Sequence, residues 1–126
     1  MTPQVIAVPT SGAHDRAMTA YAVGILHDID LGPAIVEYLE RIDATLAPFD
    51  GRFTVHGGEL DMREGDNPGA FIVIEFPDLA AAERWYASEA YQAILPLRTE
   101  HSVSTVFLVD GVGPEHRATD VLAHPA

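Results

Sequence analysis

The sequence predicts an α+β protein in which helices cover one face of a four-stranded antiparallel sheet. Three observations predict this class. The chain has 126 residues, which suits one domain of ordinary size. Four segments have the hydrophobic pattern of strands, and two regions have that of helices. Their order is β-α-β-β-α-β, which is the ferredoxin-like arrangement.

The first strand is predicted over residues 19–29, where large apolar side chains recur at every second position. Gly32-Pro33 then opens a helix, for which Asp30 is the expected cap. Apolar residues recur at helical spacing over 35–46, and Asp50-Gly51 ends the segment.

The second and third strands are predicted over 52–60 and 70–76. The polar segment 64–69 between them is typical of a hairpin loop. Gly57-Gly58 weakens the second strand and suggests a bulge or a close strand approach. The third strand is apolar on both faces except for Glu75.

A second helical region separates the third strand from the fourth. Pro77-Asp78 is expected to cap a helix over 79–87, and Ser88 a shorter helix that Pro96 limits. The fourth strand is predicted over Ser102 to Asp110. In this topology the first and third strands are the central neighbours.

The ends of the chain lack hydrophobic periodicity, so residues 1–17 and 113–126 are expected to be tails around a domain at 18–112. The first 17 residues have no basic start and only a short apolar run, unlike a signal peptide. No stretch approaches the roughly 20 apolar residues of a membrane-spanning helix. We therefore expect a cytoplasmic protein.

The sheet is predicted to be apolar on both faces, whereas two helices can cover only one. A monomer would expose several hundred Å² of apolar sheet, which is rare among soluble monomers. The simplest cover is an identical sheet across a two-fold axis, so the sequence predicts a homodimer.

The composition excludes several classes of function. The chain has no Cys, which excludes disulfides, thiolate nucleophiles and iron–sulfur clusters. It has no Lys, which excludes Schiff-base chemistry and a P-loop lysine. The net charge of -12 argues against nucleic acid and anionic membranes as partners.

Four motif groups occur together in the predicted domain. They are Phe53-Thr54-Val55-His56-Gly57-Gly58-Glu59 with Glu64-Gly65, Ile72-Val73-Ile74-Glu75-Phe76-Pro77, Ala82-Glu83-Arg84-Trp85-Tyr86-Ala87-Ser88-Glu89-Ala90-Tyr91-Gln92 with Pro96-Leu97-Arg98, and Val109-Asp110-Gly111. In this combination the chain resembles the DUF1330 family over residues 19–112.

The resemblance implies the dimeric α+β barrel superfamily, which agrees with the apolar faces of the sheet. That superfamily includes cofactor-free monooxygenases, muconolactone isomerase-like enzymes, stress-response barrels and binding proteins. DUF1330 is a domain of unknown function, so the resemblance implies a fold and no chemistry. The chain departs from the family at two positions: His56 replaces the usual Arg before the Gly pair, and Ala70 replaces a basic residue.

Side chains from the three neighbouring strands and the second helical region are expected to converge on one site. A strand His beside a strand Glu is the composition of a general base with its orienting carboxylate, and Arg98 could pair with Glu75 or receive an anion. The alternative is that Glu75–Arg98 is a structural ion pair. The expected catalytic residues are His56, Glu75 and Arg98, and the expected substrate-binding residues are His27, Trp85 and Tyr91.

No metal site or cofactor is predicted. His56 and Glu59 diverge on a strand, and no His-x-His or His-x-x-x-His spacing occurs. The leading hypothesis is a cofactor-independent enzyme that acts on a small organic molecule by acid–base chemistry. The alternatives are a non-catalytic ligand-binding or interaction module, and an auxiliary dimer with no ligand. A closed pocket around His56 would favour chemistry, and an exposed His56 would favour binding or the absence of any ligand.

Overall fold

The structure, a computed structural model, describes residues 18–123. The predicted tail 1–17 and residues 124–126 lie outside the described residues. The strands are β1 (Ala20–His27), β2 (Arg52–His56), β3 (Ala70–Phe76) and β4 (Val103–Asp110). The helices are α2 (Pro33–Leu46), α3 (Leu79–Ala87) and α4 (Glu89–Thr99), with short 3-10 helices η2 (Ala47–Phe49) and η3 (Ala118–Ala123).

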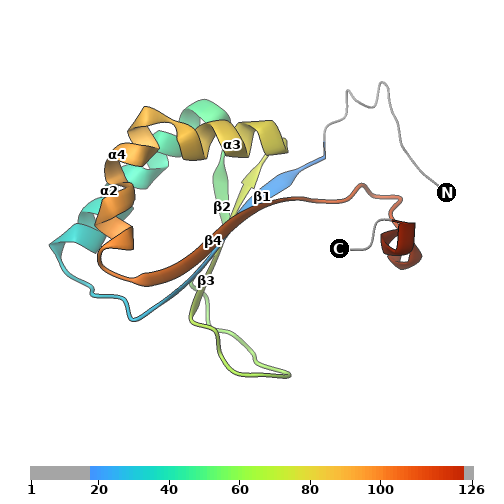
Figure 1. The fold of residues 1–126 in the computed structure, drawn as a ribbon, viewed down its shortest axis with the longest axis horizontal. Coiled ribbons are helices and arrows are strands. Elements are labelled where there is room, and N and C mark those ends of the chain that lie inside the picture. Colours follow the sequence, from blue (N-terminus) through green and yellow to red (C-terminus); the bar gives the residue numbers. More distant parts are fainter. Residues whose placement is uncertain (1–17, 124–126) are drawn as a thin grey trace.

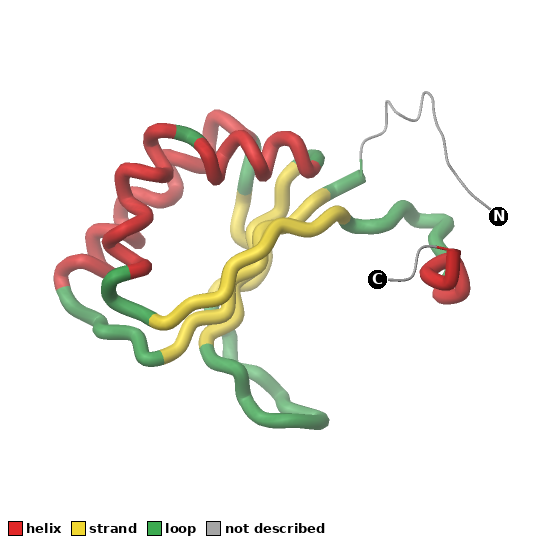
Figure 2. The backbone as a smooth tube through the Cα atoms, viewed as in Figure 1, coloured by secondary structure: helices red, strands yellow, loops and turns green. Residues whose placement is uncertain are grey.

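The four strands form one antiparallel sheet in the order β2-β3-β1-β4. As predicted, β1 and β3 are the central neighbours. All three α-helices lie on the same face of the sheet, and the other face is left bare by them (Figures 1 and 2). This is the predicted ferredoxin-like α+β fold.

Local signals place the helix starts of α3 and α4. The Asp78 carboxylate accepts a hydrogen bond from the backbone N–H of Ala81 at 2.7 Å. The Ser88 hydroxyl accepts one from the backbone N–H of Tyr91 at 3.2 Å. Both residues are N-caps, as the sequence predicts.

Three predicted details are wrong. Gly32, not Asp30, is the N-cap of α2, and the helix start has no side-chain cap. Pro96 does not limit α4, because the helix continues to Thr99 with Pro96 inside it. β2 ends at His56 because Gly57, with a φ of 73°, turns the chain into the left-handed region.

The core lies between the helices and the sheet. Trp85 joins α3 to α2, since its indole N–H donates to the Thr45 hydroxyl at 3.0 Å. The Trp85 ring also packs on Tyr91 of α4 and on Phe76 of β3. These contacts fix the three helices over the sheet and shape the space between the two layers.

On the face of the sheet opposite the helices, β4 keeps its apolar side chains exposed. Val103, Phe107 and Val109 alternate along β4 on this face and are 51%, 46% and 42% exposed.

Beyond β4, η3 lies within the predicted C-terminal tail and stands apart from the sheet (Figure 1). Over residues 18–123, the helices are too short or too polar to cross a membrane.

Candidate functional site

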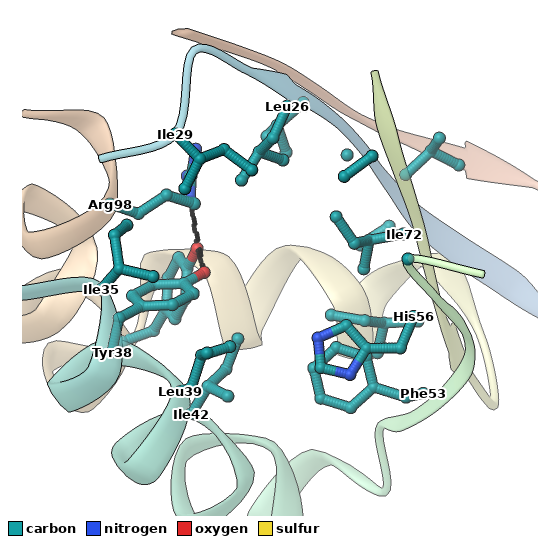
Figure 3. A pocket seen from close by; sticks show the side chains of 18 of the residues that line it. Leu26, Ile29, Ile35, Tyr38, Leu39, Ile42, Phe53, His56, Ile72 and Arg98 are labelled. Carbon is teal, nitrogen blue, oxygen red and sulfur yellow. Dashed lines mark hydrogen bonds between the residues drawn. The ribbon is translucent and has the colours of Figure 1, made fainter. Parts of the chain in front are cut away.

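A cavity of about 260 Å³ lies between the helices and the sheet (Figure 3). Aliphatic and aromatic side chains supply most of its walls, with Ile35 and Ile42 from α2 and Ile72 and Ile74 from β3 among them. Within the described part of the chain, the ionisable side chains that line it are Tyr38, His56, Tyr91 and Arg98. The cavity is therefore an apolar chamber with few polar groups, which is the usual composition of a small-molecule site.

Arg98 forms the polar end of the cavity. It lies in the last turn of α4, and only 4% of it is exposed. Its guanidinium donates hydrogen bonds to three hydroxyls: from Nη1 to Ser104 at 2.5 Å, from Nε to Tyr38 at 3.3 Å and from Nη2 to Tyr91 at 3.4 Å. These bonds connect α4 with β4 and α2.

Tyr38 and Tyr91 form a hydroxyl pair beside the guanidinium. Their oxygens are 2.7 Å apart, and the two rings pack edge to face. Arg98 also lies over the Tyr38 ring, 5.7 Å from its centroid. Dashed lines in Figure 3 mark this cluster at the side of the cavity away from His56.

The electrostatics of this cluster keep Arg98 charged and Tyr38 neutral. Burial, followed by the neighbouring Tyr91, raises the pKa of Tyr38 well above its ordinary value. Burial alone would lower the pKa of Arg98, but the two tyrosine hydroxyls outweigh it and the pKa is raised. No acidic side chain in residues 18–123 forms an ion pair with Arg98.

His56 lies on the opposite wall of the cavity because of a β-bulge. The register of β2 against β3 shifts between Phe53 and Val55, so that Phe53 pairs with Ile74 and His56 with Ile72. Both side chains therefore face the helices, and the two rings stack at 4.3 Å between centroids. His56 is exposed, so it stands at the mouth of the cavity.

The expected convergence of His27 and Glu75 with this site is wrong. Glu75 pairs in register with Tyr21 and Arg52, one position away from the helix-facing Ile74, and so points to the bare face. Its carboxylate accepts a hydrogen bond from Arg52 at 3.2 Å, and the expected Glu75–Arg98 pair does not form. His27 is exposed at the end of β1 and contacts Asp28 at 3.0 Å.

Trp85 and Tyr91 do line the cavity with Arg98, as the sequence predicts, and both belong to the core as well. The functional roles expected of these residues stay predictions. Two members of the polar cluster, Tyr38 and Ser104, were not expected. Tyr38 had a signal, because it lies on the apolar stripe of α2 between Ile35 and Ile42 while carrying a hydroxyl.

Metal ligation has no candidate group among residues 18–123. No three His, Asp or Glu side chains in this range gather closely enough to hold an ion. The cavity offers one imidazole at its mouth, and the other polar side-chain groups that line it are tyrosine hydroxyls, a guanidinium and the indole N–H of Trp85, which donates to Thr45. These side chains suit hydrogen bonding and proton transfer.

A family model described as "Domain of unknown function (DUF1330)" matches residues 19–112. The chain belongs to the DUF1330 family. The match covers the whole sheet and the three α-helices, and it ends before η3. The comparison with curated proteins gives no match.

Solved structures share the fold of this DUF1330 member. A protein of unknown function from Rhodopseudomonas palustris, RPA0582, has a TM-score of 0.56 at 14% identity, over 84% of this chain and 96% of that chain. SnoaB, a cofactor-independent oxygenase from Streptomyces nogalater, has a TM-score of 0.50 at 19% identity, over 80% of this chain and 100% of that chain. At these identities the likeness concerns the fold alone.

Proposed function

We propose that this protein binds a small, largely apolar organic molecule in the cavity between its helices and its sheet. The cavity itself carries the proposal. Its walls are mostly aliphatic and aromatic, and its volume is about 260 Å³. An apolar cavity of about 150 Å³ already holds benzene, so this one has room for a substituted ring. The exposure of His56 favours binding over catalysis.

The binding proposal has a built-in reporter. Trp85 is the single Trp of the chain, it lines the cavity, and it is 2% exposed. Titration with ethylbenzene should change the Trp85 fluorescence in a saturable way, and calorimetry should give the same affinity. A linear, unsaturable response would contradict the proposal.

A variant that fills the cavity with a larger side chain tests whether the ligand binds there. Gly24 lines the cavity, and a Cβ there would meet its nearest neighbour, Leu26, at an ordinary 3.5 Å. Gly24→Leu should therefore occupy the space and weaken ethylbenzene binding at least tenfold. Gly58→Leu is the matched control, since a Cβ at Gly58 has nothing within 4 Å. Equal binding by both variants would place the ligand elsewhere.

The second candidate function is a cofactor-independent enzyme that works by proton transfer. The observation that favours it is the position of His56 on the cavity wall across from Arg98 and the tyrosine hydroxyls (Figure 3). The imidazole would take a proton from a carbon next to a carbonyl. The electron pair would move to the carbonyl oxygen, where Arg98 and the hydroxyls would hold the enolate. Return of the proton would complete the cycle.

Hydrogen–deuterium exchange tests this chemistry without knowledge of the natural substrate. In D₂O, the protein should accelerate exchange at the acidic carbon of 2-indanone, and His56→Gln should remove that acceleration. His27→Gln is the matched control, because His27 is exposed and does not line the cavity. Exchange at the uncatalysed rate with wild-type protein would leave binding as the function.

We also propose that the protein is a homodimer that buries the bare face of the sheet. The support is the row of exposed apolar side chains on β4, which includes Phe107 and Val109. The fold leaves this face without a helix (Figure 1).

A further inference from the structure

Arg98 is a buried cation whose described partners are all neutral. Ser104, Tyr38 and Tyr91 each supply a hydroxyl oxygen, and no described carboxylate pairs with the guanidinium. Its place in the last turn of α4 adds only the partial negative charge of the helix end. An arginine cannot shed its proton to escape burial, because its pKa is too high. The charge is therefore held next to the cavity without a counterion among residues 18–123.

The cluster has more hydrogen-bond donors than acceptors. Three of the five N–H groups of a guanidinium are used by the three hydroxyls, which leaves two. The tyrosine pair has two O–H groups, and the 2.7 Å bond between the oxygens uses only one of them. The second O–H has no described acceptor. A ligand that completes this cluster must therefore bring acceptors, and a negative charge fits best.

The rest of the cavity restricts the size and charge of that ligand. Arg98 is the only permanently charged group among the lining residues that the structure describes. One buried cation neutralises one negative charge, whereas a dianion such as a phosphate monoester would leave a net charge buried in an apolar chamber. The apolar walls on both sides of the cluster suit a hydrocarbon body.

From this we infer that the Arg98 end of the cavity is an anion site, and that the ligand is a small carboxylate with an apolar, ring-sized body. The carboxylate would take the two remaining guanidinium donors and the free tyrosine O–H, in a fork that arginine matches well. Its hydrocarbon part would extend toward Phe53 and His56. This inference rests on the proposed binding function, and it names the class of molecule bound.

The test compares phenylacetate with phenylacetamide, which has nearly the same shape and no charge. Calorimetry and Trp85 fluorescence at pH 7 should show that the wild-type protein binds phenylacetate at least tenfold more tightly. A preference below twofold would overturn the anion site, while saturable ethylbenzene binding would keep the proposed function. If none of the three compounds binds, the proposed function fails and the anion site fails with it.

Variants identify the group that holds the anion. Arg98→Met should abolish the preference for phenylacetate over phenylacetamide, because it removes the positive charge from the cavity. Tyr38→Phe should reduce the preference several-fold, since it removes one hydroxyl of the cluster. Circular dichroism checks the fold of both. Should Arg98→Met not fold, the wild-type preference together with Tyr38→Phe still decides the question. A preference unchanged in a folded Arg98→Met variant would contradict the assignment.

Discussion

Arg98 and Glu75 show at the scale of single residues how one step along a strand separates two charges. Glu75 adjoins Ile74, whose side chain faces the helices and is 4% exposed. Successive strand residues point to opposite faces, so the Glu75 carboxylate lies on the far side of the sheet from Arg98. It pairs instead with Arg52, and their side chains are 31% and 69% exposed.

Replacing Glu75 or Arg98 should therefore change stability differently from breaking a buried ion pair. Glu75→Gln should change the free energy of unfolding by less than about 1 kcal/mol, because its pair with Arg52 is largely solvated. Arg98→Met should lower the free energy of unfolding by about 1–3 kcal/mol, because the hydroxyls of Ser104, Tyr38 and Tyr91 lose their charged donor. Denaturant unfolding measures both. Losses of roughly 3–5 kcal/mol in both variants would instead indicate a buried Glu75–Arg98 pair in solution.

The sequence could not show which face of the sheet His56 lies on, because that depends on a register shift in β2. Strict alternation from Phe53 would put His56 on the opposite face. The bulge between Phe53 and Val55 adds a residue and brings both rings to the cavity side. The Gly pair that follows suggested an irregularity, but the register shift lies before it. Trp85 and Tyr91 were found because their helical spacing and size direct them toward the sheet, and Arg98 because it follows that helical region in the sequence.

At the scale of elements, the sequence predicted best those segments whose ends carry a chemical signal. β3 and α3 have the predicted bounds, since Gly69 precedes the strand and Asp78 caps the helix. The end of α4 was missed because Pro96 removes one backbone donor without ending the helix. The last turn of α4 carries Arg98 into the core. The helix end that the sequence misplaced is therefore the part of α4 that positions the polar end of the cavity.

The helix caps give a prediction at this scale. Asp78→Ala should lower the free energy of unfolding by about 0.5–2 kcal/mol, because the N–H of Ala81 loses its acceptor. Asp30→Ala is the control, since α2 begins at Gly32 without a side-chain cap. It should stay within about 0.5 kcal/mol of wild type. Equal losses in the two variants would show that the carboxylates act through general electrostatics and not as caps.

At the scale of the whole molecule, the two faces of the sheet differ in what covers them. The helix side encloses the cavity, and the other side presents exposed apolar side chains along β4. The strand pattern predicted both faces, because the strands are apolar at odd and even positions. A net charge of -12 makes two copies of this chain repel each other at long range, so the proposed dimer must be held by short-range apolar contacts.

Light scattering should therefore give a mass of about twice 13.6 kDa for the wild-type protein at micromolar concentration. Phe107→Glu should reduce the mass to that of one chain, since it puts a charge in the row of exposed apolar side chains on β4. Val36→Glu is the matched control: Val36 is on α2 and 47% exposed, against 46% for Phe107, so its replacement should leave the dimer intact. Circular dichroism should show both variants folded. A wild-type monomer, or equal dissociation of the two variants, would contradict the assignment of the bare face as the dimer interface.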